Sequence, residues 1–319
     1  MTTLDTATRI VPVLLLFVTG FLLRRARFLS ATTMSELKKL VVTVTLPALM
    51  FVAFLSLRLA RDELILAGSI FGLCLVLLLL SRLVDRLSAG RWGIRSFMMG
   101  GFEAGMLGYA LYLSVFGDGA LPIFASVDLG QVVFVFVILM PILQSRRVDS
   151  TDSAGTRGGA AAAVKGIVQQ AAKSPIIWAI AGGLLLGAIG RSVSISPEPF
   201  RPIAGFLDIV GNLTAPLIAL VIGYELDFSG GVIGKAVAFV FVRKLVLIGT
   251  ALLGLALVPG IGNLTRFAIL TMLLLPPPYV VTLAARDDEK ALTAGILSVS
   301  TVVSVLAFAA VVLVTGGSI

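Results

Sequence analysis

Apolar residues run through this chain in long blocks, and short segments between the blocks carry most of the charge. A helix needs about 20 mostly apolar residues to cross a bilayer. Reading for such blocks predicts ten spans, so the expected fold is an all-α polytopic membrane protein. The predicted spans are residues 7–24, 39–57, 64–83, 96–116, 121–143, 174–190, 207–226, 237–258, 267–285 and 291–314.

The ninth block is interrupted by Pro276-Pro277-Pro278, in the middle of the uncharged stretch from Phe267 to Ala285. Proline has no N–H to donate to the carbonyl four residues earlier. Irregular backbone survives at membrane depth only where it is buried in protein or lines a wet cavity. We therefore predict a discontinuous helix that marks a candidate solute site. The carbonyls expected to need other donors are those of Met272, Leu273 and Leu274.

The fourth block carries a carboxylate, Glu103, within a glycine-rich stretch. Gly101, Gly105 and Gly108 would share one face of a regular helix, a pattern typical of close helix packing. The alternative is a second unwound segment that pairs with the prolines. Glu103 favours a functional site, because an ionisable group at this depth costs at least ~2.5 kcal/mol.

The odd number of predicted spans in each half predicts how the two halves are oriented relative to each other. Residues 1–143 and 174–319 each hold five predicted spans, and a polar linker, residues 144–173, separates them. Since five is odd, the second half must insert upside down, which predicts two inverted five-helix repeats. Residues 45–49 resemble residues 214–218 at an offset of 169, and further echoes occur at an offset of 170. The latter pair Gly108 and Tyr109 with Pro278 and Tyr279, and Asp128 and Gln131 with Ser298 and Thr301.

Composition agrees with a membrane protein. The chain is 58% hydrophobic and 13% charged, with a mean hydropathy of +1.07. The absence of His and the single Cys exclude His catalysis, His-based metal sites and internal disulfides. The first block is expected to be a retained helix, since no basic stretch precedes it.

The distribution of the basic residues, which give the chain a net charge of +8, predicts its orientation in the membrane. With the N-terminus outside, cytoplasmic connections collect 19 of the 25 basic residues, counting Arg243 and Lys244 near the start of span eight. This asymmetry favours ten spans with both termini on the extracytoplasmic side of the cell membrane. The basic charge is thus an orientation signal, and nucleic acid is not an expected partner.

Asp128 and Gln131 lie three residues apart, so they face the same way on a helix. They are expected to share a polar cavity with groups from spans four and ten; the competing interpretation places Asp128 near the surface. Carboxylate, amide and hydroxyl oxygens are hard ligands, suited to Na⁺ or a proton and not to transition metals. The predicted coupling-ion residues are Glu103, Asp128, Gln131, Ser298 and Thr301, with Ser300 nearby. Neither a bound metal nor an organic cofactor is expected.

Other charged residues receive simpler interpretations. Glu225, Asp227, Arg243 and Lys244 are expected to be interfacial, with the basic side chains snorkelling to the membrane surface. The helix half-ends would then hold a substrate carboxylate without any buried Arg or Lys. The stretch from Arg286 to Lys290 looks like a magnesium-binding cluster, but a short turn before span ten explains it as well.

Short motifs along almost the whole chain resemble the auxin efflux carrier family, which is related to the bile acid:sodium symporters. They are Gly20-Phe21-Leu22-Leu23-Arg24-Arg25, Leu46-Pro47-Ala48-Leu49-Met50-Phe51, Ser174-Pro175-Ile176-Ile177, Ala215-Pro216-Leu217-Ile218-Ala219-Leu220 with Gly223 and Leu226, the proline break, and Ala285–Thr293.

The resemblance implies a panel domain and a core domain in which discontinuous spans four and nine cross, with a small organic anion bound beside the crossing. Where the family usually has asparagine and proline in span four, this chain has Gly101, Glu103 and Gly108. An acidic residue there favours cation coupling or a less anionic substrate. The predicted substrate-binding residues are Gly101, Glu103, Gly105, Gly108, Tyr109, Pro276, Pro277, Pro278 and Tyr279.

The leading hypothesis is secondary active transport of a small organic solute by alternating access, coupled to H⁺ or Na⁺ or to neither. The chain has no P-loop of the G-x-x-x-x-G-K-[ST] form. The alternatives are an intramembrane enzyme with a metal on Asp287, Asp288 and Glu289, and a channel. Expected partners are the lipid bilayer, the solute and a second copy of the chain in a homodimer.

Overall fold

The computed structural model describes residues 3–89, 92–149, 172, 174–193, 201–228, 231–257 and 261–315. Every secondary-structure element among these residues is helical, of the α, 3₁₀ or π type, which confirms the all-α prediction. Most of the predicted linker lies outside the described residues. Its first residues belong instead to a helix that continues to Asp149.

The helices match the predicted spans in order, with η marking 3₁₀ and π segments. They are α1 (Thr3–Arg25), α2 (Ala31–Leu40), η1 (Val41–Thr45), α3 (Leu46–Ser56), α4 (Arg61–Leu87), η2 (Gly93–Ser96), η3 (Ala104–Gly108), α5 (Tyr109–Phe116), η4 (Asp118–Ala120), α6 (Leu121–Phe134), η5 (Val135–Leu139), α7 (Met140–Asp149), α9 (Pro175–Val193), α10 (Arg201–Asn212), α11 (Thr214–Glu225), α12 (Ile233–Leu257), α13 (Asn263–Leu274), η7 (Tyr279–Ala284) and α14 (Asp287–Thr315).

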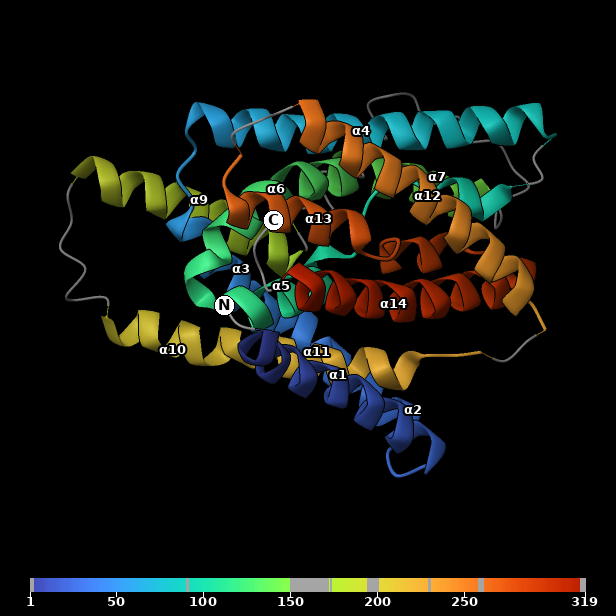
Figure 1. Cartoon of the computed structure of the whole chain (residues 1–319), viewed down its shortest axis with the longest axis horizontal. Coiled ribbons are helices and arrows are strands. Elements are labelled where there is room, and N and C mark those ends of the chain that lie inside the picture. Colours follow the sequence, from blue (N-terminus) through green and yellow to red (C-terminus); the bar gives the residue numbers. More distant parts are fainter. Residues whose placement is uncertain are drawn as a thin grey trace.

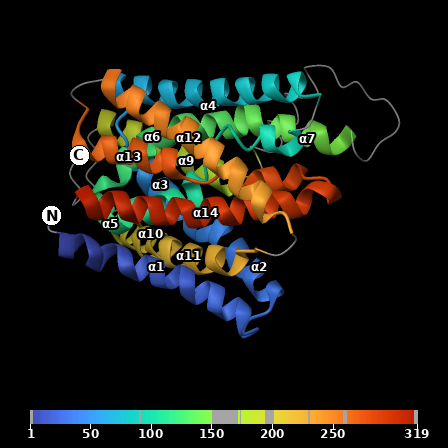
Figure 2. The same ribbon diagram turned by 45° about the vertical axis from the view of Figure 1, so that its right-hand side comes forward.

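Eight segments of the described chain are long and apolar enough to cross a membrane. They are Ala31–Ser56, Arg61–Leu87, Asp118–Arg146, Pro175–Val193, Arg201–Glu225, Ile233–Leu253, Asn263–Ala284 and Asp287–Thr315. The other two predicted spans correspond to α1 and to the shorter apolar helix Ala104–Phe116. The protein is therefore a multi-pass membrane protein. The start of α1 and the end of α14 lie at the same end of the bundle (Figure 2).

One group of helices, which we call the panel, consists of α1, α2, α3, α9, α10 and α11. In it α1 packs on α11, and α3 packs on α9 and α10. These contacts are close because glycine allows backbones to approach. A Cβ on Gly20 would collide with the backbone of α11, and one on Gly183 would lie 2.6 Å from the Phe51 carbonyl oxygen on α3. The panel helices are thus held together backbone against backbone.

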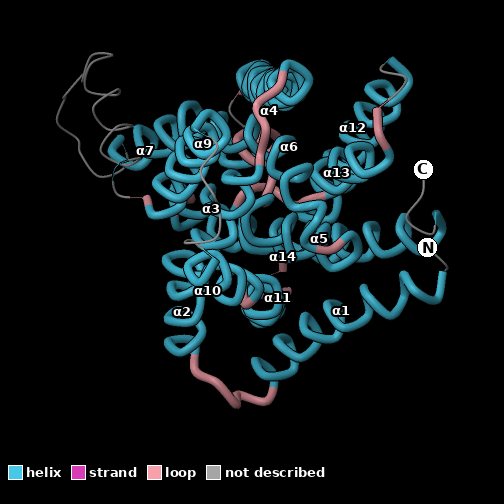
Figure 3. The backbone as a smooth tube through the Cα atoms, turned by 90° about the vertical axis from the view of Figure 1, so that its left-hand side faces the viewer, coloured by secondary structure: helices cyan, strands magenta, loops and turns pink. Residues whose placement is uncertain are grey.

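The second group, which we call the core, consists of α4, α5, α6, α7, α12, α13 and α14 with their η segments. Here α4 and α13 pack on α6, and α12 packs on α14. A Cβ on Gly130 of α6 would collide with the backbone of α4 at Ala67. In Figures 1 and 3 α1, α10 and α11 lie along one side of the molecule, and α4, α6, α12 and α13 lie on the opposite side.

The boundary between the two groups, which we call the seam, is formed by α1 and α11 against α5, α1 against α14, and α3 against α6. Gly105 of η3 has Leu46 of α3 as its neighbour, and a Cβ added there would lie 3.6 Å from Leu46 Cδ2, an ordinary contact distance. At Gly105 core and panel therefore meet through a side chain, without the close backbone contact seen at Gly20, Gly183 and Gly130.

Candidate functional site

The fourth span is unwound. After η2 the chain leaves the helix for residues 97–103, and it resumes helical geometry at Ala104. Gly101 has a φ of +82°, a conformation that a side chain would strain. The interpretation of Gly101, Gly105 and Gly108 as one face of a regular helix is wrong for Gly101, because that residue is outside any helix.

The ninth span is broken at the prolines, as the sequence predicts. α13 ends at Leu274, Leu275 is extended with a ψ of 156°, and helical geometry returns only in η7. The Met272 carbonyl accepts a hydrogen bond from the Leu275 N–H at 3.1 Å. The remaining carbonyls of the break need donors from elsewhere in the protein.

The two breaks cross and bond to each other directly. The backbone N–H of Glu103 donates to the Pro276 carbonyl at 3.0 Å. The Tyr279 N–H donates to Glu103 Oε2 at 2.6 Å. Gly101 also lies against the prolines, since a Cβ there would be 3.3 Å from Pro278 Cγ. The carboxylate predicted to be functional thus closes the crossing, with a relative exposure of only 9%.

The donors that complete the breaks come from α12, and this corrects a prediction. Arg243 and Lys244 are not interfacial, because their relative exposures are 0% and 7%. Arg243 donates through Nε to the Met98 carbonyl at 3.1 Å, through Nη1 to Leu275 at 2.8 Å and through Nη2 to Gly101 at 2.9 Å.

Lys244 completes the same set of contacts. Its ammonium donates to the carbonyls of Leu274 and Leu275 and to Ser304 Oγ. Two consequences follow for the sequence analysis. The expectation of a site without buried Arg or Lys is wrong, and both residues leave the count of cytoplasmic charges, which retains a large excess on that side.

Asp128, Gln131 and Tyr109 form a second buried group next to the first break. Their relative exposures are 1%, 5% and 0%. Gln131 Nε2 donates to the carbonyl of Phe102 within that break. The Tyr109 hydroxyl and the Asp128 carboxyl form a hydrogen-bonding pair, which leaves one carboxyl oxygen of Asp128 and Oε1 of Gln131 without a hydrogen-bond partner. Unpaired buried oxygens are costly, so this group is a candidate site for a proton or a hard cation.

Ser298 and Thr301, the remaining predicted ion ligands, have other hydrogen-bond partners. Ser298 Oγ accepts the backbone N–H of Asp227 at 2.8 Å, across the seam. The Thr301 hydroxyl lies 3.2 Å from that of Tyr279. Ser298 thus contacts the segment after α11, and Thr301 contacts Tyr279.

Two ion pairs lie within the panel, near one end of the seam. Lys38 pairs with Glu225 at 2.8 Å, and Arg24 pairs with Asp227 at 3.1 Å. The ammonium of Lys38 also lies 5.3 Å from the ring centroid of Tyr279. Lys38 of the panel therefore contacts Tyr279 next to the crossing. Glu225 and Asp227 are only partly buried, in line with their predicted interfacial position.

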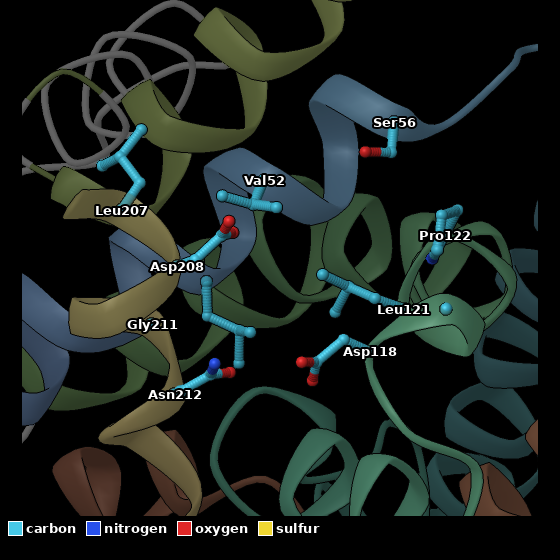
Figure 4. Close-up of a pocket in the computed structure, with 11 residues that line it drawn as sticks. Val52, Ser56, Asp118, Leu121, Pro122, Leu207, Asp208, Gly211 and Asn212 are labelled. Atoms are coloured by element: carbon cyan, nitrogen blue, oxygen red, sulfur yellow. The ribbon is translucent and has the colours of Figure 1, made fainter. Parts of the chain in front are cut away.

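At the other end of the seam there is a cavity of about 220 Å³ between α3, α10 and the start of α6. Figure 4 shows Asp208 and Asn212 on α10 facing Asp118 of η4 across it. No local sequence pattern joins these residues, so the sequence does not predict them as part of a site. A larger cavity of about 930 Å³ is lined by α4, α6, α12 and α13 within the core.

The acidic stretch before α14 has a structural role. Glu289 Oε1 accepts the backbone N–H of Ile94 at 3.0 Å and pairs with Arg146 at 2.7 Å. Its Oε2 accepts the Arg286 N–H at 3.1 Å, at the start of the helix. No group of three or more His, Cys, Asp or Glu residues that could hold a metal occurs in the described part of the chain. The turn interpretation is thus the better one.

Two broken helices that cross inside a multi-pass helical bundle, with charged groups buried at the crossing, define a membrane transport protein. A family model described as membrane transport protein matches residues 5–312. The chain therefore belongs to this family, the auxin efflux carrier family. No curated protein matches it closely enough to count.

Proposed function

We propose that this protein is a secondary active transporter of a small organic anion that works by alternating access. The observation that carries the proposal is the direct meeting of the two breaks, through the Glu103–Pro276 and Tyr279–Glu103 hydrogen bonds. Broken helices that meet at membrane depth supply half-helix ends and free polar groups to a solute. The solute binds beside Gly101, Glu103, Gly105, Gly108, Tyr109, Pro276, Pro277, Pro278 and Tyr279.

The packing supports a ten-span architecture of two inverted repeats. Span one packs on span seven as span two packs on span six, and span three packs on span five as span eight packs on span ten. These are the pairs that a twofold relation between residues 1–143 and 174–319 exchanges. The shared end of the bundle for the start of α1 and the end of α14 fits an even number of spans.

Movement of the core against the panel provides alternating access. Close glycine contacts join helices within each group, whereas the seam at Gly105 has ordinary spacing. The Asp227–Ser298 hydrogen bond and the contact of Lys38 with the Tyr279 ring close one end of the seam, and a cavity opens the other. By the charge distribution, the closed end faces the cytoplasm, the open end faces outside, and the protein resides in the cell membrane with both termini outside.

The coupling ion, H⁺ or Na⁺, binds at the unpaired oxygens of Asp128 and Gln131, next to Glu103. Two carboxyl groups near a solute site allow the charge there to change during the cycle. Ser298 and Thr301 adjust the site from α14 through Asp227 and Tyr279. The proposal needs no organic cofactor and no nucleic acid; the bilayer and a second copy of the chain are the expected partners.

The test begins with a melting-temperature screen of purified protein against organic acids, with and without Na⁺ and at two pH values, because a bound ligand raises apparent stability. Uptake of the best acid is then measured in proteoliposomes. Glu103→Gln and Asp128→Asn should melt like the wild type yet lower uptake by at least about tenfold, the equivalent of ~1.4 kcal/mol.

The matched controls are Glu36→Gln and Asp288→Asn, which make the same chemical changes at exposed positions. Both should transport normally. Normal uptake and ion dependence in both crossing variants would exclude these carboxyl groups from the site. Flux that does not saturate, without exchange of labelled acid, would identify a channel instead.

A further inference from the structure

The carbonyl groups of the breaks are the chemistry from which we draw a further inference. In broken-helix transporters, unwound carbonyls are ligands for Na⁺. Here the carbonyls of Met98, Gly101, Leu274 and Leu275 all accept hydrogen bonds from side chains of α12. Positions that would suit a metal ion are thus already taken by positive groups of the protein.

The geometry of Arg243 fits this role. Its three nitrogens each reach a different carbonyl, two on the first break and one on the second. The guanidinium is fully buried and lies 5.3 Å from the ring centroid of Phe102. A planar fork with fixed donors can hold several acceptors at once, which an ammonium on a flexible stem does less well. Arg243 therefore joins both breaks as a bound ion would.

We propose that Arg243 and Lys244 are resident cations that replace a metal ion at the helix crossing. The crossing is then assembled without Na⁺, and any coupling ion binds at the separate oxygens of Asp128 and Gln131. The positive charge of the Arg243 guanidinium at the breaks also favours an organic anion over a cation as the solute. The inference rests on the proposed function, since it concerns the same crossing.

The experiment compares wild type, Arg243→Ala and Arg243→Lys, with Lys235→Ala as the control from an exposed position on the same helix. Melting temperatures are measured in NaCl and in choline chloride at equal ionic strength, and with guanidinium at levels that leave the wild type unchanged. The buried Cys74, the single cysteine of the chain, is followed by its rate of maleimide labelling.

Arg243→Ala should melt about 5–10 °C lower, because several charge-assisted hydrogen bonds are lost. It should also label faster at Cys74, whose backbone carbonyl lies next to Gly100. Guanidinium, and to a smaller extent Na⁺, should restore at least half of both losses, and Arg243→Lys should lie between Arg243→Ala and wild type. Lys235→Ala should behave as wild type.

Two outcomes would overturn the inference. One is Na⁺ stabilisation of the wild type that survives in Asp128→Asn, which would place a metal ion at the crossing itself. The other is a folded Arg243→Ala that no cation rescues. If Arg243→Ala does not fold, Lys244→Met is tested in the same way with methylammonium as the rescuing cation. Since no transported solute is used, failure here leaves the transport proposal standing, and a failed uptake experiment leaves this result unaffected.

Discussion

Residues 97–103 leave helical geometry through glycine, whereas Leu275–Pro278 leave it through three consecutive prolines. The first break contributes the buried carboxylate, Glu103, and the second contributes only backbone groups. Arg243 and Lys244 of α12 donate hydrogen bonds to the carbonyls of these breaks. The first half of the chain has no equivalent cation, since the position 169 residues before Arg243 is Cys74 of α4. The two breaks thus stop their helices in different ways, and acid and base come from different halves of the chain.

This asymmetry teaches which features of a break are local and which are not. Glycine or proline decides where the helix stops, since one tolerates unusual φ and the other removes a donor. Whether the break persists depends on partners that lie far away in sequence. Arg243 is 142 residues from Gly101 and 32 from Leu275. Substitutions in each break can therefore separate the local requirement from the distant one.

The largest effect is expected for Gly101→Ala. A Cβ there faces both a φ of +82° and contacts of 3.3 Å to Pro278 Cγ and 3.4 Å to Phe134 Cε1. We expect a loss of about 2 kcal/mol in the free energy of unfolding, combining backbone strain with crowding. Reversible unfolding in detergent checks this.

The control for Gly101 is Gly231→Ala. Gly231 has a φ of +66° but nothing within 4 Å of the added Cβ. Gly231→Ala should lower the free energy of unfolding by less than Gly101→Ala does. The difference between the two losses should equal the contribution from crowding. Equal losses at the two positions would mean that the close fit between the breaks contributes nothing.

Pro277→Ala should lower the free energy of unfolding by about 1 kcal/mol, less than Gly101→Ala. The added freedom of the unfolded chain accounts for most of it. The break itself should persist, because Arg243 and Lys244 hold the carbonyls of Leu274 and Leu275. Reversible unfolding in detergent measures this loss. A loss larger than that of Gly101→Ala would show that the prolines, not the distant cations, maintain the second break.

The sequence predicted the parts of this site that depend on local chemistry. Three prolines cannot continue a helix, and spacing alone places Asp128 and Gln131 on one face. Arg243 and Lys244 were misjudged because the predicted span began at residue 237. The helix starts at Ile233, which places both residues deeper and beyond the reach of simple snorkelling. An adjacent basic pair well inside a 25-residue helix, whose other charged residue, Lys235, lies in the first turn, was the available signal.

The acidic lining of the seam cavity had no such signal. Asp118 and Asp208 come from elements that only the tertiary fold brings together. The hydrogen bonds of Ser298 with Asp227 and of Thr301 with Tyr279 were equally out of reach, because the offset that pairs Ser298 and Thr301 with Asp128 and Gln131 describes a symmetry of position and not a contact. Sequence patterns predicted which residues share a face of a helix. Which of these faces pack against each other could be learned only from the tertiary structure.

The smallest effect on stability is expected for Gly105→Ala, which addresses the seam between core and panel. The new methyl group would meet Leu46 Cδ2 at 3.6 Å, without collision. Alanine also has a higher helix propensity than glycine. The new contact and the gain in propensity together should change the free energy of unfolding by less than about 0.5 kcal/mol. Transport should fall more than stability does, because the methyl group lies where the core must pass the panel. Gly105→Leu should slow uptake further, in proportion to its bulk, while the solute still raises the melting temperature. If both variants transport at the wild-type rate, the moving surface lies elsewhere and the seam at Gly105 is only a packing contact.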